Sequence, residues 1–250
     1  MKKAILMIFL TIFSISKSFS QKDTIHIFGP GGPYPAMREA ADNFEKKFNV
    51  KVNITKGPLK KWQSEAEKKA DLIYSGSENM MSTFLSIFKE NINSKTDYPL
   101  YYRKSGLIVR KGNPKKIKNI FDLQNSNLKI MVVNGAGLIG VWEDIFGKMK
   151  DLDAFRKIKA NINYYAEDSA SAEKHWKENS DVDVWITWNI WQISNSDSAD
   201  FISLKEKYTI YRDFGIVLSK VGEKKEVVNL FYEYLKSKEA EKTFNKWGWK

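Results

Sequence analysis

Four turns rich in small residues carry groups that could bind an anion. Each turn follows a predicted strand and precedes a predicted helix. Backbone N–H groups at a helix start are free to donate, and the helix dipole favours negative charge there. Helix capping and turn formation alone also account for each turn, but the four together favour a ligand cleft. The candidate contacts are Gly31, Gly32, Ser75, Gly76, Ser77, Asn134, Gly135, Ala136, Gly137, Ser169 and Ser171.

Tryptophans near predicted element ends are further candidates. Trp176, Trp185, Trp188 and Trp191 lie close together in the sequence. Trp188 ends a predicted strand, where its ring can form a cleft wall and its indole N–H can donate to an anion. Trp62, at the start of a predicted helix, is a weaker candidate for the same role. Packing in a hydrophobic core is the alternative for every one of these rings.

No residue pattern selects an enzyme class. The two histidines, His26 and His175, and the absence of cysteine exclude a histidine-rich metal site and thiol catalysis. The glycine patterns of dinucleotide-binding and phosphate-binding loops are missing. A pair of catalytic carboxylates across a cleft stays open, although nothing selects one. We therefore expect no enzymatic activity, no cofactor and no bound metal.

Alternating short strands and helices would position these groups. Apolar and β-branched runs at 24–28, 51–55, 71–74, 101–110, 130–133, 164–165, 182–188 and 208–219 predict strands or extended segments. Helical spacing of apolar residues predicts helices near 35–48, 60–69, 79–88, 141–149, 154–160, 168–179, 227–234 and 239–247. This order predicts an α/β fold of two lobes, each a mostly parallel sheet flanked by helices. The carboxyl ends of parallel strands share one sheet edge, so the four turns would gather there.

Length and charge narrow the class of protein further. The 250 residues are 42% hydrophobic and 28% charged, enough to bury a substantial core, which excludes intrinsic disorder. The formal net charge is +11, but the lysines are dispersed among glutamates and form no recognisable nucleic-acid motif. We therefore expect a basic surface with a mild attraction for small anions, and no nucleic-acid partner.

Residues 1–20 have the features of a secretory signal peptide. Lys2 and Lys3 precede an apolar run at 4–15, and Ser18-Phe19-Ser20 is a small-x-small cleavage pattern. The apolar run is too short for a bilayer, which requires roughly 20 residues. We expect cleavage near Ser20 and Gln21, a periplasmic location and no stable membrane insertion.

Seven segments, in order, resemble the accessory colonization factor AcfC family, including its surface-antigen relatives in Campylobacter. They are HIFGPGGPYPAMREAADNFEKKFNVKV, GPLKKWQSEAEKKADLIYSGS, GNPKKIKNIFDL, GAGLIGVWEDIFG, DVWITWNIW, YTIYRDFGIV and LKSKEAEKTFNKWGWK. The resemblance implies a two-lobed type II periplasmic binding protein fold, related to sulfate and molybdate binders. It also implies binding of small oxyanions, or of phosphorylated or carboxylated metabolites such as phosphoglycerate.

The resemblance also implies boundaries and partners. Lobe I would comprise residues 21–101 plus 213–250, and lobe II residues 102–212. Arg212 would lie near a crossing between the lobes and contact the ligand. Beside the small anionic solute, the implied partners are an ABC permease and a second copy of the chain. The family is also linked to colonisation.

One departure from the family bears on the ligand. Only Leu138 and Ile139 separate Gly137 from Gly140, where the family has a longer loop with hydroxyls and a lysine. Losing such donors puts phosphoglycerate in doubt and leaves a smaller anion or a different acid open. If Leu138 and Ile139 are exposed at the cleft mouth, a surface interaction protein or adhesin that kept the fold is the alternative. An exported hydrolase is a third reading, which a screen for turnover would test.

Overall fold

The structure is a computed structural model that describes residues 24–250. The predicted signal peptide, residues 1–20, lies outside the described residues. The strands are β1 (Thr24–Gly29), β2 (Lys51–Lys56), β3 (Leu72–Tyr74), β4 (Tyr98–Arg110), β5 (Ile130–Val133), β6 (Ile162–Ala166), β7 (Val184–Trp188), β8 (Ala199–Ser203) and β9 (Tyr211–Leu218). The helices are α1 (Tyr34–Phe48), α2 (Gln63–Lys69), α3 (Glu78–Ile87), α4 (Val141–Gly147), α5 (Leu152–Ala160), α6 (Ser169–Glu178), α7 (Ile190–Ile193), α8 (Glu226–Leu235) and α9 (Lys238–Lys246).

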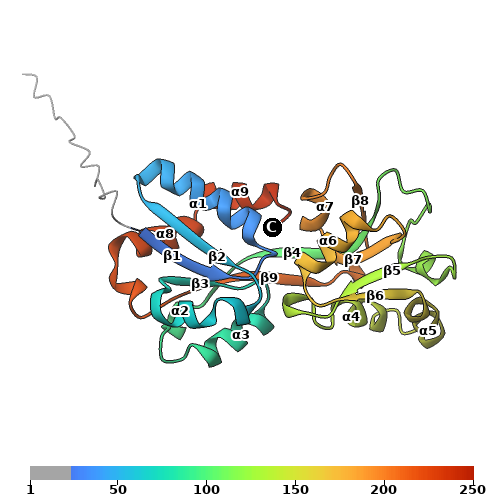
Figure 1. Cartoon of the computed structure of the whole chain (residues 1–250), viewed down its shortest axis with the longest axis horizontal. Coiled ribbons are helices and arrows are strands. Elements are labelled where there is room, and N and C mark those ends of the chain that lie inside the picture. Colours follow the sequence, from blue (N-terminus) through green and yellow to red (C-terminus); the bar gives the residue numbers. More distant parts are fainter. Residues whose placement is uncertain (1–23) are drawn as a thin grey trace, which may run out of the picture.

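The strands form two parallel groups joined by an antiparallel pair. Their order is β2-β1-β3-β9-β4-β7-β5-β6, and β8 also pairs with β4. β1 is parallel to β2 and β3, and β5 is parallel to β6 and β7. Figure 1 shows the two groups side by side, each flanked by helices, with β4 and β9 running between them. The predicted α/β fold class is confirmed.

We call the two units lobe I (β1–β3, α1–α3, α8 and α9) and lobe II (β5–β8 and α4–α7). β4 pairs with β9 from Tyr98 to Lys104, and then with β7 and β8 from Ser105 to Arg110. The strand therefore crosses from one lobe to the other between Lys104 and Ser105. The predicted domain boundaries at 101–102 and 212–213 stay a prediction, because strand pairing does not show which residues move together.

Lobe I is held together by helices from both ends of the chain. One face of α1 buries Met37, Ala40 and Phe44, and the Phe44 ring lies 4.9 Å from the Phe231 ring of α8. Lys47 of α1 forms an ion pair with Glu239 of α9 at 2.6 Å. The C-terminal helices thus return to lobe I, where they cover apolar surface that α1 and the sheet would otherwise expose.

Lobe II has a tryptophan-rich core. β5 and β7 are buried along their whole length, and Trp176 and Trp185 are 1% and 0% exposed. The core-packing alternative therefore holds for these two rings. Sequence patterns predicted neither α7 nor β8, because both elements are only four or five residues long. The part of the chain from residue 24 onward contains no helix with the length and hydrophobicity that a membrane crossing requires.

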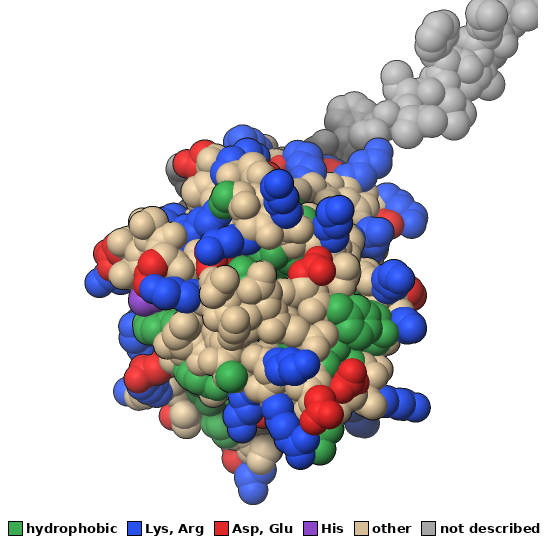
Figure 2. Space-filling model, turned by 90° about the vertical axis from the view of Figure 1, so that its right-hand side faces the viewer, with side chains coloured by type: hydrophobic (Ala, Val, Ile, Leu, Met, Phe, Trp, Pro, Cys, Tyr) green, Lys and Arg blue, Asp and Glu red, His purple; other side chains and the backbone are tan. Residues whose placement is uncertain are grey.

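The charged surface shows no single patch on the face seen in Figure 2, which views the end of the molecule formed by lobe II. Lys and Arg side chains are spread over this face among Asp and Glu side chains. Several are in exposed ion pairs, such as Lys129 with Asp181 and Arg156 with Asp153. The basic net charge is thus dispersed on this face.

Candidate ligand-binding cleft

Arg103 lies on β4 near the crossing, and its guanidinium is buried between the lobes. The residue is 3% exposed, and its Nη2 donates to the Gly76 carbonyl at 2.8 Å. Its Nε and Nη1 find no hydrogen-bond partner within residues 24–250. A buried donor without a partner costs about 1–3 kcal/mol, and more when it is charged. These two nitrogens therefore keep hydrogen-bonding capacity that no group in residues 24–250 uses.

The charge of Arg103 is held between two indole rings. Its Cζ lies 4.7 Å from the ring centroid of Trp188 and 4.7 Å from that of Trp249. Trp188 ends β7 in lobe II, whereas Trp249 follows α9 of lobe I. Burial lowers the pKa of Arg103 to about 9, while the charge of Asp213 acts in the opposite direction. Arg103 thus stays cationic at neutral pH, and it forms no ion pair with any described carboxylate.

Glycines from three turns surround the guanidinium. A Cβ atom on Gly32 would lie 2.9 Å from Arg103 Nη1, and one on Gly76 would lie 2.9 Å from Nη2. A Cβ on Gly137 would lie 3.5 Å from Nη2 and 3.4 Å from the Gly76 carbonyl oxygen. Gly32 and Gly76 belong to lobe I and Gly137 to lobe II. The structure therefore brings three of the four predicted turns together around one buried cation.

The last two residues of β7 and the residue that follows them carry polar atoms without a hydrogen-bond partner. Thr187 Oγ1, Trp188 Nε1 and Asn189 Oδ1 are buried without a hydrogen-bond partner among the described residues. They lie at the carboxyl end of a strand that is parallel to β5, the usual edge for ligand binding in such sheets. Of these three residues, Trp188 is the one whose ring lies beside Arg103; Thr187 precedes it in the strand, so its side chain points to the opposite face of the sheet.

Ser75 and Asp213 form a second polar pair, on lobe I and β9. Ser75 and Asp213 are both buried. Neither Ser75 Oγ nor Asp213 Oδ2 has a hydrogen-bond partner within the described chain. A Cβ on Gly215 would lie 3.2 Å from the first atom and 3.4 Å from the second. Burial raises the pKa of Asp213 above its usual range, against the opposing charge of Arg103.

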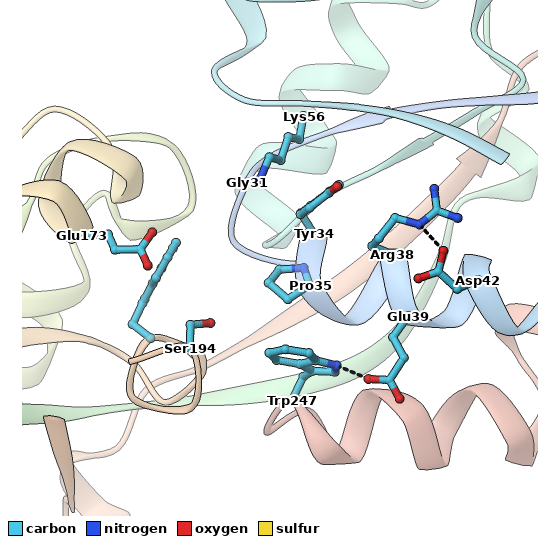
Figure 3. Close-up of a pocket in the computed structure, with 11 residues that line it drawn as sticks. Gly31, Tyr34, Pro35, Arg38, Glu39, Asp42, Lys56, Glu173, Ser194 and Trp247 are labelled. Carbon is cyan, nitrogen blue, oxygen red and sulfur yellow. Dashed lines mark hydrogen bonds and ion pairs between the residues drawn. The ribbon is translucent and has the colours of Figure 1, made fainter. Parts of the chain in front are cut away.

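An open cleft of about 450 Å³ lies between the two lobes (Figure 3). Its lining does not include Arg103, but it includes Gly31, which precedes Gly32, and Trp247, two residues before Trp249. Figure 3 shows Tyr34, Pro35 and Trp247 of lobe I facing Glu173 and Ser194 of lobe II. The volume is in the range of sites for small organic molecules, ~300–1,000 Å³. The full lining is Gly31, Tyr34, Pro35, Arg38, Glu39, Asp42, Lys56, Glu173, Trp191, Ser194 and Trp247.

The carboxylates of the open cleft have partners. Glu39 accepts from Trp247 Nε1 and from Lys246, each at 2.7 Å, and Lys246 is the main cause of its lowered pKa. Asp42 pairs with Arg38 at 2.8 Å, and Glu173 with Lys177 at 2.9 Å.

Lys56 is the cation of this wall without a carboxylate partner among residues 24–250. Its Nζ lies 3.8 Å from the Tyr34 ring centroid. A ring binds a cation without neutralising it. The cleft wall therefore has one positive charge that a ligand could use.

Several predicted contacts are already used for local structure. Ser77 caps α3 by accepting from the Met80 N–H at 3.3 Å, and Ser171 forms a capping box with Asp168. A Cβ on Gly135 would lie 1.8 Å from the Glu167 carbonyl oxygen, so glycine is required there by chain packing. At these positions, helix capping or turn formation is enough to explain why the residue is serine or glycine, without a ligand.

The remaining predicted contact residues lie in different parts of the structure. Gly31 lines the open cleft. Asn134 accepts from Trp142 Nε1 at 3.3 Å, Ala136 begins a short 3₁₀ turn, and Ser169 is the first residue of α6. Arg212 is bound to Asp144 of α4 at 3.0 Å and is partly exposed, so its guanidinium is committed to a surface ion pair.

Trp62 lies outside the cleft. It is 1% exposed, its Nε1 donates to the Gly57 carbonyl at 2.9 Å, and its ring stacks on Phe88 in the core of lobe I. The expectation that both Leu138 and Ile139 are exposed is wrong for Leu138, which is 3% exposed in the core of lobe II. Ile139 is exposed.

Sequence reasoning missed the central cation. The site contains Arg103, Thr187, Asn189, Asp213 and Trp249, none of which was among the predicted contacts. A charged residue at the predicted crossing was a usable signal for Arg103. Trp249 has no comparable signal, because it follows the last predicted helix. Within residues 24–250, no three His, Cys, Asp or Glu side chains are placed to hold a metal ion.

The chain is similar to known proteins in sequence and in fold. A family model described as bacterial extracellular solute-binding protein matches residues 25–250. The structure of Peb3 from Campylobacter jejuni is 33% identical, with a TM-score of 0.82, over 90% of this chain and 99% of that one. PEB3 with L-phospholactate bound gives a TM-score of 0.83 at the same identity and coverage.

A more distant structure shares the fold. The periplasmic molybdate-binding protein of Azotobacter vinelandii is 13% identical, with a TM-score of 0.70, over 90% of this chain and 98% of that one. A search of curated protein sequences finds no significant match.

Proposed function

The chain belongs to the bacterial extracellular solute-binding protein family and has the expected two-lobed type II fold, and from this premise we propose that it closes its lobes around a small anionic solute in the periplasm. The proposal rests mainly on the buried, unpaired guanidinium of Arg103. Between glycine turns of both lobes, its buried charge has two nitrogens without a hydrogen-bond partner and no ion pair among the residues from 24 onward. A buried charge is costly unless it is paired, and an anionic ligand would supply the missing pair.

The binding groups would come from both lobes. Arg103 supplies the positive charge, Ser75 of lobe I a hydroxyl, and Trp188 of lobe II an indole N–H. An anion that touches both sides is bound more tightly by the closed form than by an open one. Ligand binding would therefore shift the protein toward closure by that difference in affinity.

We infer that the solute is a small organic acid, phosphorylated or carboxylated, in preference to an inorganic oxyanion. The open cleft has about fifteen times the ~30 Å³ that one water molecule occupies in the liquid. Its rings, Tyr34, Trp191 and Trp247, suit an organic body, and Lys56 suits a second acidic group. The likeness to PEB3, described with L-phospholactate bound, supports the same class.

Transport is a further part of the proposal. Delivery to an ABC permease and a place in the AcfC-like branch of the family are supported by the family match and by the 33% identity to PEB3. Cleavage near Ser20 and Gln21 would release the chain into the periplasm. A homodimer and a role in colonisation remain predictions of the resemblance.

Calorimetric titration tests the proposal. The protein from residue 21 onward is titrated with sulfate, molybdate, phosphate, citrate and phosphoglycerate, and its thermal unfolding is followed with each. We expect heat release and a higher Tm with at least one organic acid, and weaker effects with sulfate and molybdate. Tight binding of sulfate or molybdate alone would contradict the organic acid.

Absence of binding and of any Tm shift across the whole panel would contradict solute binding itself. That outcome would favour the surface interaction protein. On the structural side, its support now rests on the exposed Ile139 alone, because Leu138 is buried.

A further inference from the structure

The four residues after α9, Trp247–Lys250, run along the crossing between the lobes. Lys250 N donates to the Tyr102 carbonyl at 2.7 Å, and Tyr102 N donates to the Lys250 carbonyl at 2.6 Å. This reciprocal pair adds a short extra strand segment beside β4, next to Arg103. Figure 1 shows the C-terminal end between the two lobes. We call Trp247–Lys250 the C-terminal strap.

The strap also contacts lobe II. Asn189, which follows β7, donates from Nδ2 to the Gly248 carbonyl at 2.8 Å. Gly248 has a φ of +81°, and a Cβ there would lie 2.3 Å from Asn189 Nδ2 and 3.0 Å from Ile193 Cδ1. Trp247 packs against the buried apolar clusters of both lobes. The strap is therefore anchored in lobe I and fitted closely against lobe II.

Trp249 is the part of the strap that touches the cation. It is fully buried, and its ring centroid lies 5.6 Å from that of Phe214 and 6.3 Å from that of Phe244. These contacts fix the ring in lobe I. Its centroid is 4.7 Å from Arg103 Cζ, as is that of Trp188 from lobe II. Trp249 thus sets where the guanidinium lies when the lobes are closed.

We propose that the C-terminal strap is a positioning element that holds Arg103 for the ligand and favours closure of the lobes. The inference rests on the proposed function for its ligand. Opening the cleft moves lobe II away, which separates Asn189 from Gly248 and Trp188 from Arg103. Contacts made only in the closed form raise the population of that form, and the apparent affinity follows the fraction of molecules that is competent to bind.

Asn189→Ala tests the strap with little risk to folding, because the Asn189 side chain does not cap α7. Asn91→Ala is the matched control, since it also removes an amide-to-carbonyl hydrogen bond, to Glu67 at 2.9 Å within lobe I. The chain has no cysteine, so Lys46→Cys on α1 and Lys174→Cys on α6 accept spin labels for measuring the interlobe distance.

We expect Asn189→Ala to lengthen the mean interlobe distance in the ligand-free protein. It should also weaken binding of citrate or phosphoglycerate by about three- to tenfold, the usual effect of one hydrogen bond. Asn91→Ala should change neither. Equal distances and affinities in the two variants would overturn the strap.

Gly248→Ala gives the second measurement. Its Cβ collides with Asn189, so this variant should open the cleft, and adding Asn189→Ala should bring the distance back toward that of Asn189→Ala alone. If the interlobe distance in the double variant stays as long as in Gly248→Ala alone, the proposal that the strap forms an interlobe contact is wrong. If no tested acid binds the wild type, the proposed function fails, while the distance measurement still decides whether the strap favours closure.

Discussion

Two arginines lie opposite each other where the chain crosses between the lobes. Arg103 on β4 and Arg212 on β9 are register partners, yet their surroundings differ completely. The Arg212 side chain is 31% exposed and ion-paired with Asp144, whereas Arg103 is 3% exposed and held by two indoles and one carbonyl. Arg103 is thus the one of the two whose charge has no carboxylate partner among residues 24–250, and for this reason it is the arginine that we propose for the ligand.

Arg103→Met should have the largest effect. Losing a buried charged partner costs about 2–5 kcal/mol, so affinity for an organic acid should fall at least about thirtyfold. The same change should preserve or raise the free energy of unfolding, because a buried charge is costly unless it is paired. Even the replacement of a buried ion pair by apolar side chains is often neutral or stabilising, by up to about 4 kcal/mol. Calorimetric titration and thermal unfolding measure the two effects.

Arg212→Met is the matched variant for that experiment. It removes the same charge from the facing position of the strand pair, and affinity should stay within about threefold, since an exposed pair is worth only ~0–1 kcal/mol. Equal losses of ligand affinity in Arg103→Met and Arg212→Met would contradict the proposal that only Arg103 binds the ligand.

Gly32→Ala should have the second-largest effect. The new Cβ would lie 2.9 Å from Arg103 Nη1 and force the guanidinium to shift. Displacing one charged hydrogen bond, worth about 1.5–3 kcal/mol, should weaken binding by roughly tenfold or more. Titration of the variant with the acid that binds the wild type measures this.

Gly31→Ala is the control one residue away, because its Cβ would meet nothing within 4 Å. Because Gly31 lines the open cleft, a small loss of affinity is expected, well below that of Gly32→Ala. A similar loss in both variants would mean that the turn, and not the place of Arg103, had been disturbed.

Asp213 should make binding depend on pH. Burial raises the pKa of this carboxyl, so it takes up a proton at a higher pH than an ordinary aspartate. Protonation removes a negative charge that acts on Arg103, so affinity for a fully ionised acid should rise as pH falls through that pKa. Asp213→Asn should bind about threefold tighter than the wild type at neutral pH, an electrostatic effect of ordinary size.

The pH profile of Asp213→Asn should also be flatter than that of the wild type. Glu78 and Asp97 titrate nearby, with pKa values raised by burial and by Asp213. Any pH dependence of affinity that remains in Asp213→Asn is therefore expected to come from Glu78 and Asp97. An unchanged slope would exclude Asp213 as its cause.

Asp144→Asn should have the smallest effect. It breaks the surface pair with Arg212, whose two side chains are 31% and 50% exposed, and such pairs contribute ~0–1 kcal/mol. Thermal unfolding at two salt concentrations should show a small loss of stability that shrinks at high salt. A change in ligand affinity above about threefold would show that Arg212 takes part in binding.

Much of the fold was predictable because apolar spacing marks each long element. Helices such as α1 and strands such as β4 follow that spacing, and the small-residue turns between them were recognised. The choice between Arg103 and Arg212 was not predictable in the same way. It depends on Asp144, which lies 68 residues from Arg212 along the chain, and on Trp249 near its C-terminal end.

The two tryptophans chosen as cleft walls show the same limit. Trp188 and Trp62 both lie at element junctions and both are 1% exposed. The Trp188 ring lies against Arg103 at the crossing, whereas the Trp62 ring packs between Phe28 and Phe88 in the core of lobe I. A local pattern marks a junction, and only the packing of distant segments decides whether that junction faces a partner lobe or an interior.

The indoles around Arg103 also give the protein an optical property. Indole emission depends on the local electric field, and Trp188 and Trp249 both lie 4.7 Å from a cation that an anion would neutralise. In lobe II, Trp176 lies under the Arg110 guanidinium, which donates to the carbonyls of Trp176, Asn179 and Val182. Solute uptake should therefore shift the emission of Trp188 and Trp249 against the background of the other six tryptophans, so the fluorescence of the unlabelled chain should report on its own ligand.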